Sequence, residues 1–199
     1  MRVVGGELCS RRLAPPPEGV RPTSDRVREA LFARLGDLRG CRVLDLYAGT
    51  GALAIEALSR GAQDAVLVDR SLGALNVIRS NLQSLGLESR GRVIRGDAVK
   101  TLRRLKGTQV FDLVFVDPPY ASDQVVLALA ALVEAGVLVG AATVVVESPK
   151  RHSLPPVVGF SIQDERSYGD TRLTWLVSQG RGAAKEKGMA KTDESSQRK

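Results

Sequence analysis

From residue 41 to residue 147 the chain alternates short apolar runs with longer amphipathic segments, and no other feature constrains its fold as strongly. The apolar runs are rich in valine and leucine, as expected for strands buried on both faces of a sheet. They predict strands at residues 43–47, 65–69, 92–96, 111–117 and 143–147, and the segments between them predict helices at 52–60, 72–85, 98–106 and 123–135. Repeated strand–helix units of this length form a parallel sheet that carries helices on both faces. The expected fold is therefore α/β.

The two ends of the chain depart from this alternation. Near the start, two short segments around Gly5-Gly6 are expected to pair as a β-hairpin, and Pro22-Thr23-Ser24 is expected to open a helix that runs to about residue 35. Near the end, segments 161–168 and 171–179 flank Gly169-Asp170 and predict an antiparallel hairpin at one edge of a mostly parallel, seven-stranded sheet. Residues 180–199 contain almost no apolar side chains and are expected to be disordered. The predicted organisation is a basic hairpin (1–22), one α/β domain (23–179) and a disordered tail (180–199).

The composition favours a soluble protein with a polyanionic partner. The net charge is +7 and the isoelectric point is near 9.8, and basic side chains that neutralise phosphates gain from the release of counterions. No apolar run approaches the roughly 20 residues that span a membrane, and the first six residues do not resemble a signal peptide. Cys9 and Cys41 match no metal-binding or redox spacing. We therefore expect a cytoplasmic protein with reduced cysteines, without a metal and without a membrane anchor.

The motif Asp117-Pro118-Pro119-Tyr120 is the most informative one for chemistry, because it follows the apolar run at residues 111–116. Such a strand delivers its last residues to the carboxyl edge of the sheet, where open α/β folds bind ligands. The two prolines fix φ and remove two backbone donors, so the local carbonyls face outward with little freedom. Asp117 and a carbonyl can then accept both N–H bonds of an exocyclic amino group on a flat ring, while Tyr120 stacks on that ring. The simpler alternative is a proline turn in which Asp117 acts only as a cap.

A second group of residues predicts a cofactor site at the same edge of the sheet. Residues 45–51 (DLYAGTG) cover the first predicted strand and the turn into its helix, where Gly49 and Gly51 let the backbone pass close to a ligand. Asp69 ends the second strand, 20 residues after Gly49, where a carboxylate can accept bonds from both ribose hydroxyls. Asp97 stands at the end of the third strand and is placed to accept a bond from an adenine amino group.

Different ligands are compatible with these glycines taken alone. Residues 49–54 (GTGALA) also satisfy the pattern of a nicotinamide dinucleotide site, and a purely structural glycine turn is a further alternative. Asp45 lies four residues before the first glycine and suits a ligand ammonium, whereas a pyrophosphate gains nothing from an added anion there. A hydride-transfer enzyme also has no use for the motif at residues 117–120. The residues therefore favour S-adenosylmethionine as the cofactor.

The order of these motifs resembles that of Rossmann-like, class I methyltransferases that act on exocyclic amines. Narrower similarities point to the RsmD family within that group. They lie in the motifs RVVGG (2–6), SRRL (10–13), RPTSDRVREALF (21–32), LDLYAGTGAL (44–53), EALSRGA (56–62) and YGDTRL (168–173). The likeness covers residues 1–179 and leaves the tail outside.

The resemblance implies an S-adenosylmethionine-dependent rRNA (guanine-N2-)-methyltransferase. Its substrate would be the exocyclic N2 amine of one guanine in 16S ribosomal RNA, presented in the small ribosomal subunit or an assembly intermediate. The family pattern implies that residues 117–120 hold the target base and that Gly49, Gly51 and Asp69 hold the cofactor. Asp97 matches the wider superfamily pattern, and Thr23 is expected to help hold the methionine carboxylate. The enzyme is expected to be a monomer.

Basic side chains near the start of the chain provide a candidate RNA surface, formed by Arg2, Arg11, Arg12 and Arg21. The α/β domain otherwise lacks an element for recognising a substrate, so an RNA-contacting hairpin is favoured over a merely solvated surface.

Two other functions compete with this interpretation. A methyltransferase acting on adenine N6 in DNA or RNA shares the motif at residues 117–120. A DNA-specific enzyme usually needs a separate recognition domain, however, and only about 40 residues precede the cofactor motif here. A non-catalytic RNA-binding assembly factor with a vestigial pocket is the second rival. The intact carboxylates of Asp45, Asp69 and Asp117 argue against it.

Overall fold

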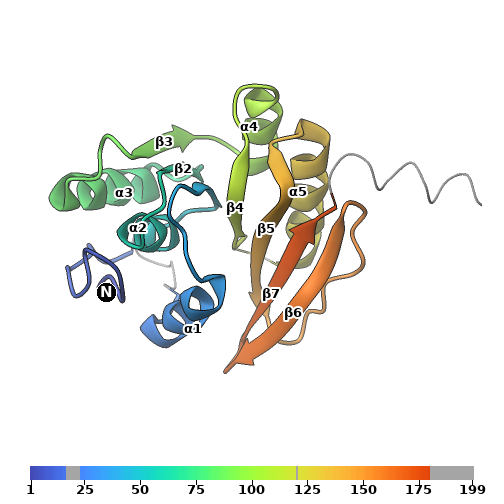
Figure 1. Cartoon of the computed structure of the whole chain (residues 1–199), viewed down its shortest axis with the longest axis horizontal. Helices are drawn as coiled ribbons and strands as arrows, with labels where there is room; N and C mark the ends of the chain where they lie inside the picture. The colour runs from blue at the N-terminus through green and yellow to red at the C-terminus, as the bar shows by residue number, and fades with distance from the viewer. Residues whose placement is uncertain (17–22, 120, 180–199) are drawn as a thin grey trace, which may run out of the picture.

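The computed structural model describes residues 1–16, 23–119 and 121–179, and these contain one seven-stranded sheet in the strand order β3-β2-β1-β4-β5-β7-β6 (Figure 1). The strands are β1 (Arg42–Leu46), β2 (Asp64–Asp69), β3 (Gly91–Arg95), β4 (Phe111–Val116), β5 (Leu138–Pro149), β6 (Phe160–Tyr168) and β7 (Thr171–Ser178). The helices are α1 (Asp25–Leu35), α2 (Ala52–Ser59), α3 (Leu72–Leu85), α4 (Ala98–Leu105) and α5 (Ala121–Ala135). The strands β1 to β5 pair in parallel, and β7 pairs antiparallel with both β5 and β6. The predicted α/β fold with a carboxyl-terminal antiparallel hairpin is confirmed.

The two faces of the sheet are covered by different helices, because successive strand residues point to opposite sides. On one face, Val43 of β1 packs in a core with residues of α1, α2 and α3. On the other face, Leu44 and Leu46 pack in a second core with residues of α4 and α5. The same alternation places Asp45 on the face of Val43, toward α2.

The strand register brings residues from four strands together at one edge of the sheet. Leu46 pairs with Val68 and Val116, and Val116 pairs with Val146. The next residue along each strand therefore lies at the same edge, which we call the carboxyl rim, and these residues are Tyr47, Asp69, Asp117 and Glu147. The rim is the edge at which parallel α/β sheets bind ligands.

The strand β5 is longer than the sequence pattern indicates. Its first residue, Leu138, pairs with Phe111, and the register between β4 and β5 then shifts before Leu113 pairs with Thr143. Ala141 lies inside the shifted part with a left-handed backbone (φ 62°). The small residues of this shifted part interrupt the apolar run in the sequence. The predicted strand therefore began only at residue 143.

The first 16 residues, which we call the arm, pack against α1 and α2 (Figure 1). The predicted hairpin is present as a single antiparallel bridge between Arg2 and Arg12 rather than as two full strands. Val3 and Leu13 of the arm are buried in the same core as α1 and α2. The arm is therefore part of the folded body, with its backbone fixed relative to the sheet.

Candidate active site at the carboxyl rim

The turn between β1 and α2, residues 47–51, forms a loop that we call the glycine loop. Three of its residues have a left-handed backbone: Tyr47 (φ 63°), Gly49 (φ 56°) and Gly51 (φ 76°). A Cβ atom on Gly51 would lie 2.9 Å from Leu67 Cδ2 in a backbone of positive φ, so another residue here would be strained and would displace Leu67. Tyr47 adopts a conformation that non-glycine residues rarely take, and such residues cluster at functional sites. Tyr47 was not predicted as a site residue, since a residue type alone gives no sign of its φ.

The Asp69 carboxylate holds the glycine loop against the end of β2. Gly49 N–H donates to Asp69 Oδ2 at 2.9 Å, and Ser71 N–H donates to Asp69 Oδ1 at 2.8 Å. Each carboxylate oxygen can accept more than one hydrogen bond. Asp69 therefore fixes the loop and keeps capacity to accept from the hydroxyl groups of a ligand.

Asp45 is a carboxyl group in the interior of the site, only 2% exposed. Ala54 N–H, in the first turn of α2, donates to Asp45 Oδ2 at 3.2 Å. Burial raises the pKa of Asp45 to about 7, and the nearby charge of Asp69 adds to this rise while the bond from Ala54 opposes it. A cationic group placed beside Asp45 would favour its ionised form.

Asp117 lies directly after β4 and is followed by the buried Pro118 and the exposed Pro119. Burial raises the pKa of Asp117 well above its ordinary value, and the charges of Glu147 and Asp45 raise it further. Tyr120, the last residue of the predicted motif, lies outside the described residues.

Glu147 is a rim residue that the sequence analysis did not identify. It follows Val146, which pairs with Val116, so it stands beside Asp117 across the β4–β5 ladder. Thr23 Oγ1 donates to Glu147 Oε2 at 3.0 Å. This bond places Thr23, predicted to hold a methionine carboxylate, at the Glu147 end of the rim. Predicting Glu147 as a site residue would have required knowing that β5 lies beside β4 in the sheet.

Asp97 forms the amino-terminal cap of α4. Lys100 N–H donates to Asp97 Oδ1 at 3.0 Å, which satisfies one of the free donors at the helix start. Burial raises the pKa of the Tyr47 phenol, and the charge of Asp97 raises it further. The charge of Asp97 thus acts on Tyr47 of the glycine loop, while the Asp97 side chain is exposed.

Two of the predicted RNA-contacting arginines, Arg2 and Arg12, lie opposite each other in the bridge of the arm. Arg2 lies 3.5 Å from Asp25 of α1, and Arg11 donates to the Ser84 carbonyl at 3.4 Å. Arg12 is exposed on the arm. Arg21 lies outside the described residues. The arm thus carries Arg2 beside α1 and Arg11 beside the end of α3.

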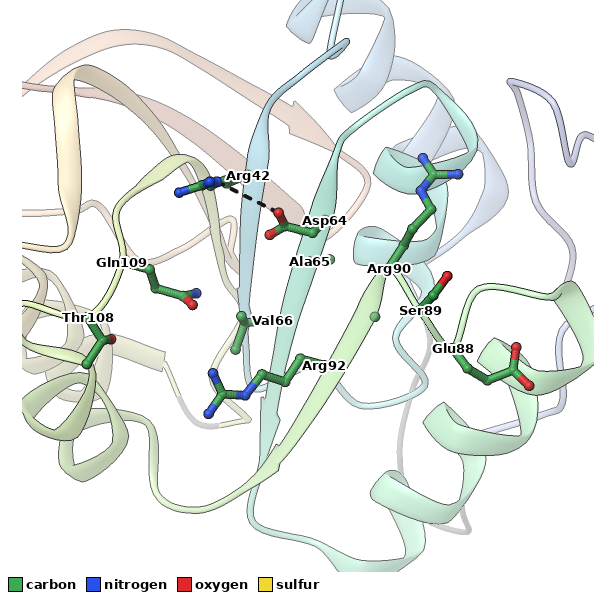
Figure 2. Close-up of a pocket in the computed structure, with 11 residues that line it drawn as sticks. Arg42, Asp64, Ala65, Val66, Glu88, Ser89, Arg90, Arg92, Thr108 and Gln109 are labelled. Carbon is green, nitrogen blue, oxygen red and sulfur yellow. Dashed lines mark ion pairs between the residues drawn. The ribbon is translucent and has the colours of Figure 1, made fainter.

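A hollow of about 540 Å³ lies at the opposite edge of the sheet, around the first residues of β1, β2 and β3 (Figure 2). Arg42 and Asp64 on its wall form an ion pair at 3.8 Å, and Arg90 donates to the carbonyls of Leu58 and Ala62. None of the predicted site residues lines it. The hollow is therefore separate from the carboxyl rim.

Neither a metal site nor a membrane span is found in the part of the chain that the structure describes. No group of three or more histidine, cysteine, aspartate or glutamate side chains there is arranged to hold a metal ion. No described helix is long and apolar enough to cross a membrane.

Known proteins resemble this chain over nearly its whole length. The family described as Conserved hypothetical protein 95 matches residues 1–177. Ribosomal RNA small subunit methyltransferase D of Escherichia coli strain K12 is 35% identical over 189 residues, which cover 92% of this chain and 94% of that protein. The protein of the same name from Haemophilus influenzae is 32% identical and covers 85% of this chain and 89% of its own length. The chain belongs to the RsmD family.

The fold agrees with this membership. The solved structure of yhhF from Escherichia coli superimposes with a TM-score of 0.81 at 34% identity, and covers 90% of this chain and 98% of its own. More distant structural neighbours carry the class I methyltransferase fold as well. The resemblance to the RsmD family and the Rossmann-like class I fold, both expected from the sequence, are confirmed.

Proposed function

We propose that the protein transfers a methyl group from S-adenosylmethionine to the exocyclic N2 amine of a specific guanine in 16S ribosomal RNA. The observation that carries this proposal is the Asp117-Pro118-Pro119 turn at the carboxyl rim, beside the glycine loop, in a member of the RsmD family. The names of relatives at 35% and 32% identity support ribosomal RNA of the small subunit as the substrate. The residues at the rim support the amine chemistry.

The residues of the rim fit S-adenosylmethionine. The Cβ position of Gly49 is open, since its nearest neighbour is the Tyr47 carbonyl oxygen at 4.0 Å, so the loop can offer bare backbone to a ligand. Asp69 and Asp97 stand at the ends of β2 and β3, where hydroxyl and amino groups of an adenosine can donate to them. Asp45 supplies a buried carboxyl group for the ammonium of the methionine part.

Asp117 and the Pro118 carbonyl position the amine that reacts. When bound, S-adenosylmethionine supplies an electrophilic methyl group on a sulfonium. The guanine amino lone pair is delocalised into the ring, so accepting both amino hydrogens at Asp117 and Pro118 favours a pyramidal nitrogen with its lone pair directed at the methyl carbon. Transfer would form a C–N bond at the guanine nitrogen and break the C–S bond, with the sulfide leaving on the rest of the cofactor. Positioning of this kind can lower a barrier by about 7–11 kcal/mol.

The nitrogen must lose a proton after it gains the methyl group. Asp117 already accepts a bond from this nitrogen, so its ionised carboxylate is the nearest acceptor for the proton. A stronger base is not required, because the amine becomes acidic once it is methylated. Tyr120 completes the proposed site by stacking on a base turned out of its helix or loop.

The remaining parts of the chain have proposed roles outside the reaction. Residues 1–22 contact the RNA through Arg2, Arg11, Arg12 and Arg21, residues 23–179 form the catalytic domain, and residues 180–199 are a basic tail. The net charge of +7 suits binding to ribosomal RNA. The enzyme acts as a monomer in the cytoplasm and needs neither a metal nor a membrane.

Transfer of a labelled methyl group tests the proposed function. The protein is incubated with methyl-labelled S-adenosylmethionine and, in separate reactions, with small ribosomal subunits, deproteinised 16S RNA and duplex DNA. The expected product is N2-methylguanosine at one position of 16S RNA. Methylated adenine would instead identify the adenine-N6 rival. Cofactor binding without transfer to any of the three would identify the assembly factor.

A further inference from the structure

Asn81 is a polar side chain in the interior of the molecule, 1% exposed on the buried face of α3. Ile78, three residues earlier on that face, lies next to Gly51 of the glycine loop. An amide removed from water is costly unless both of its ends are hydrogen-bonded. The hydrogen-bond partners of the Asn81 amide therefore indicate its role in the structure.

The two ends of the Asn81 amide bind two segments that are far apart in the sequence. Its Nδ2 donates to the Thr50 carbonyl at 3.0 Å, and its Oδ1 accepts from Ala14 N–H at 2.8 Å. Thr50 lies between the two glycines of the glycine loop and is itself buried. Ala14 belongs to the arm. One side chain thus connects the proposed cofactor loop to the proposed RNA-contacting arm.

The arm is bonded to α2 as well, and α2 begins directly after Gly51. Val4 N–H donates to Glu56 Oε2 at 2.8 Å, Ser59 Oγ donates to the Gly5 carbonyl at 2.6 Å, and Leu8 N–H donates to Ser59 Oγ at 2.9 Å. These bonds hold the first half of the arm on the helix. Asn81 holds the second half, and it alone among these contacts also bonds the glycine loop.

We infer that Asn81 is a positioning residue that couples the two sites: ordering of the glycine loop by the cofactor stabilises the arm, and docking of the arm favours the loop conformation that binds the cofactor. The inference rests on the proposed function for the identity of the two ligands. The coupling is reciprocal, because a change in one equilibrium caused by the other must act equally in both directions. The arm is folded in both states, and it should open less often when S-adenosylmethionine is already bound.

Two substitutions separate the two ends of the amide. Asn81→Asp keeps an acceptor for Ala14 N–H but, when ionised, cannot donate to the Thr50 carbonyl, whereas Asn81→Leu removes both bonds. Asn76→Asp is the matched control, because Asn76 is exposed on the same helix. Each variant is characterised by its thermal unfolding, by the dissociation constant for S-adenosylmethionine from calorimetry, and by hydrogen exchange of the amides at residues 3–14.

In the wild-type protein and in Asn76→Asp, S-adenosylmethionine is expected to slow exchange of the arm amides by about fivefold or more. Asn81→Asp should keep the slow basal exchange of the arm, lose the response to the cofactor, and bind it about 5- to 100-fold more weakly. In Asn81→Leu the arm amides should exchange faster even without cofactor.

An unresponsive arm in the wild-type protein, or a full response in Asn81→Asp, would overturn the inference. The readouts need no RNA, so cofactor binding without an arm response refutes only this coupling, whereas absence of cofactor binding refutes the proposed function.

Discussion

At the scale of single residues, carboxyl groups gather at and beside the carboxyl rim, and Asp45 among them is almost fully buried. Burial is the main cause of the raised pKa values of Asp45 and Asp117, and neighbouring carboxylates add to both. An isolated buried anion costs free energy that a cationic ligand or a hydrogen-bond donor can offset. A sulfonium, an ammonium and an amino group are ligands of this kind, so the electrostatics that raise these two pKa values also favour the proposed substrates.

Asp117→Ala is expected to lower the rate of methyl transfer by about a hundredfold or more, because a contact that positions the reacting nitrogen is lost. The dissociation constant for S-adenosylmethionine should change little. Single-turnover assays and calorimetry measure the two effects separately. Glu134→Ala, which removes an exposed carboxylate on α5, serves as the control. Normal turnover in Asp117→Ala would remove this residue from the catalytic site.

The pKa of Asp45 predicts how cofactor affinity depends on pH. Because this pKa is raised to about 7 in the free protein, the protonated form dominates below pH 7. Binding of a ligand ammonium requires the ionised form and lowers the pKa in the complex, so binding must release a proton at low pH. The dissociation constant should therefore rise as pH falls below 7, approaching about tenfold per pH unit. Calorimetry from pH 6 to pH 8 measures this, and Asp45→Asn should show a flat profile with weaker binding at pH 8. A flat wild-type profile would contradict the proposed role.

At the scale of elements, the arm has a backbone that is fixed to the folded body and basic side chains that are exposed. Val3 and Leu13 are buried, while Arg11 and Arg12 remain exposed. A basic side chain on a fixed backbone loses little further chain entropy when it meets a phosphate. The arm is thus suited to contact RNA at a set distance from the carboxyl rim.

Replacing both Arg11 and Arg12 with alanine is expected to weaken binding to 16S RNA and to leave the affinity for S-adenosylmethionine unchanged. Each lost phosphate contact should reduce the slope of log K against log salt by about 0.7–0.9. Filter binding across a salt series gives the slope. Arg39→Ala is the control, since Arg39 is 82% exposed and paired with Asp37 away from the arm. An unchanged slope in the double variant would show that these arginines do not contact phosphates.

The elements were predictable from the sequence wherever their signals are local. Apolar runs that end at a glycine or proline predicted the positions of the strands. Because the carboxyl ends of parallel strands meet at one edge, these runs also predicted where the site residues gather. Side chains whose neighbours depend on strand order or on a loop conformation were not predictable. Glu147 belongs to this group because it is defined by the pairing of β4 with β5. Asn81 belongs to it because its partners lie 31 and 67 residues away.

At the scale of the whole molecule, the positive charge is divided between the folded body and the tail. Residues 180–199 carry six basic and three acidic side chains, so three of the seven net charges lie there. In the described part of the chain the last strand, β7, ends at Ser178, and Gln179 N–H donates to the Gly159 carbonyl at 2.9 Å. The tail is therefore expected to influence RNA binding through charge and to contribute little to folding.

Truncation after Gln179 tests this division. The melting temperature should stay within about 3 °C of the full chain, the span of roughly 1 kcal/mol for a domain of this size. Affinity for S-adenosylmethionine should also be unchanged, because every proposed cofactor residue precedes the cut. Binding to 16S RNA should weaken at low salt and converge with that of the full chain at high salt, since nonspecific charge attraction is screened there. Scanning calorimetry and a salt series of RNA binding measure these quantities. A large fall in melting temperature would mean that the catalytic domain extends beyond residue 179, and equal RNA affinity at every salt concentration would remove the tail from RNA binding.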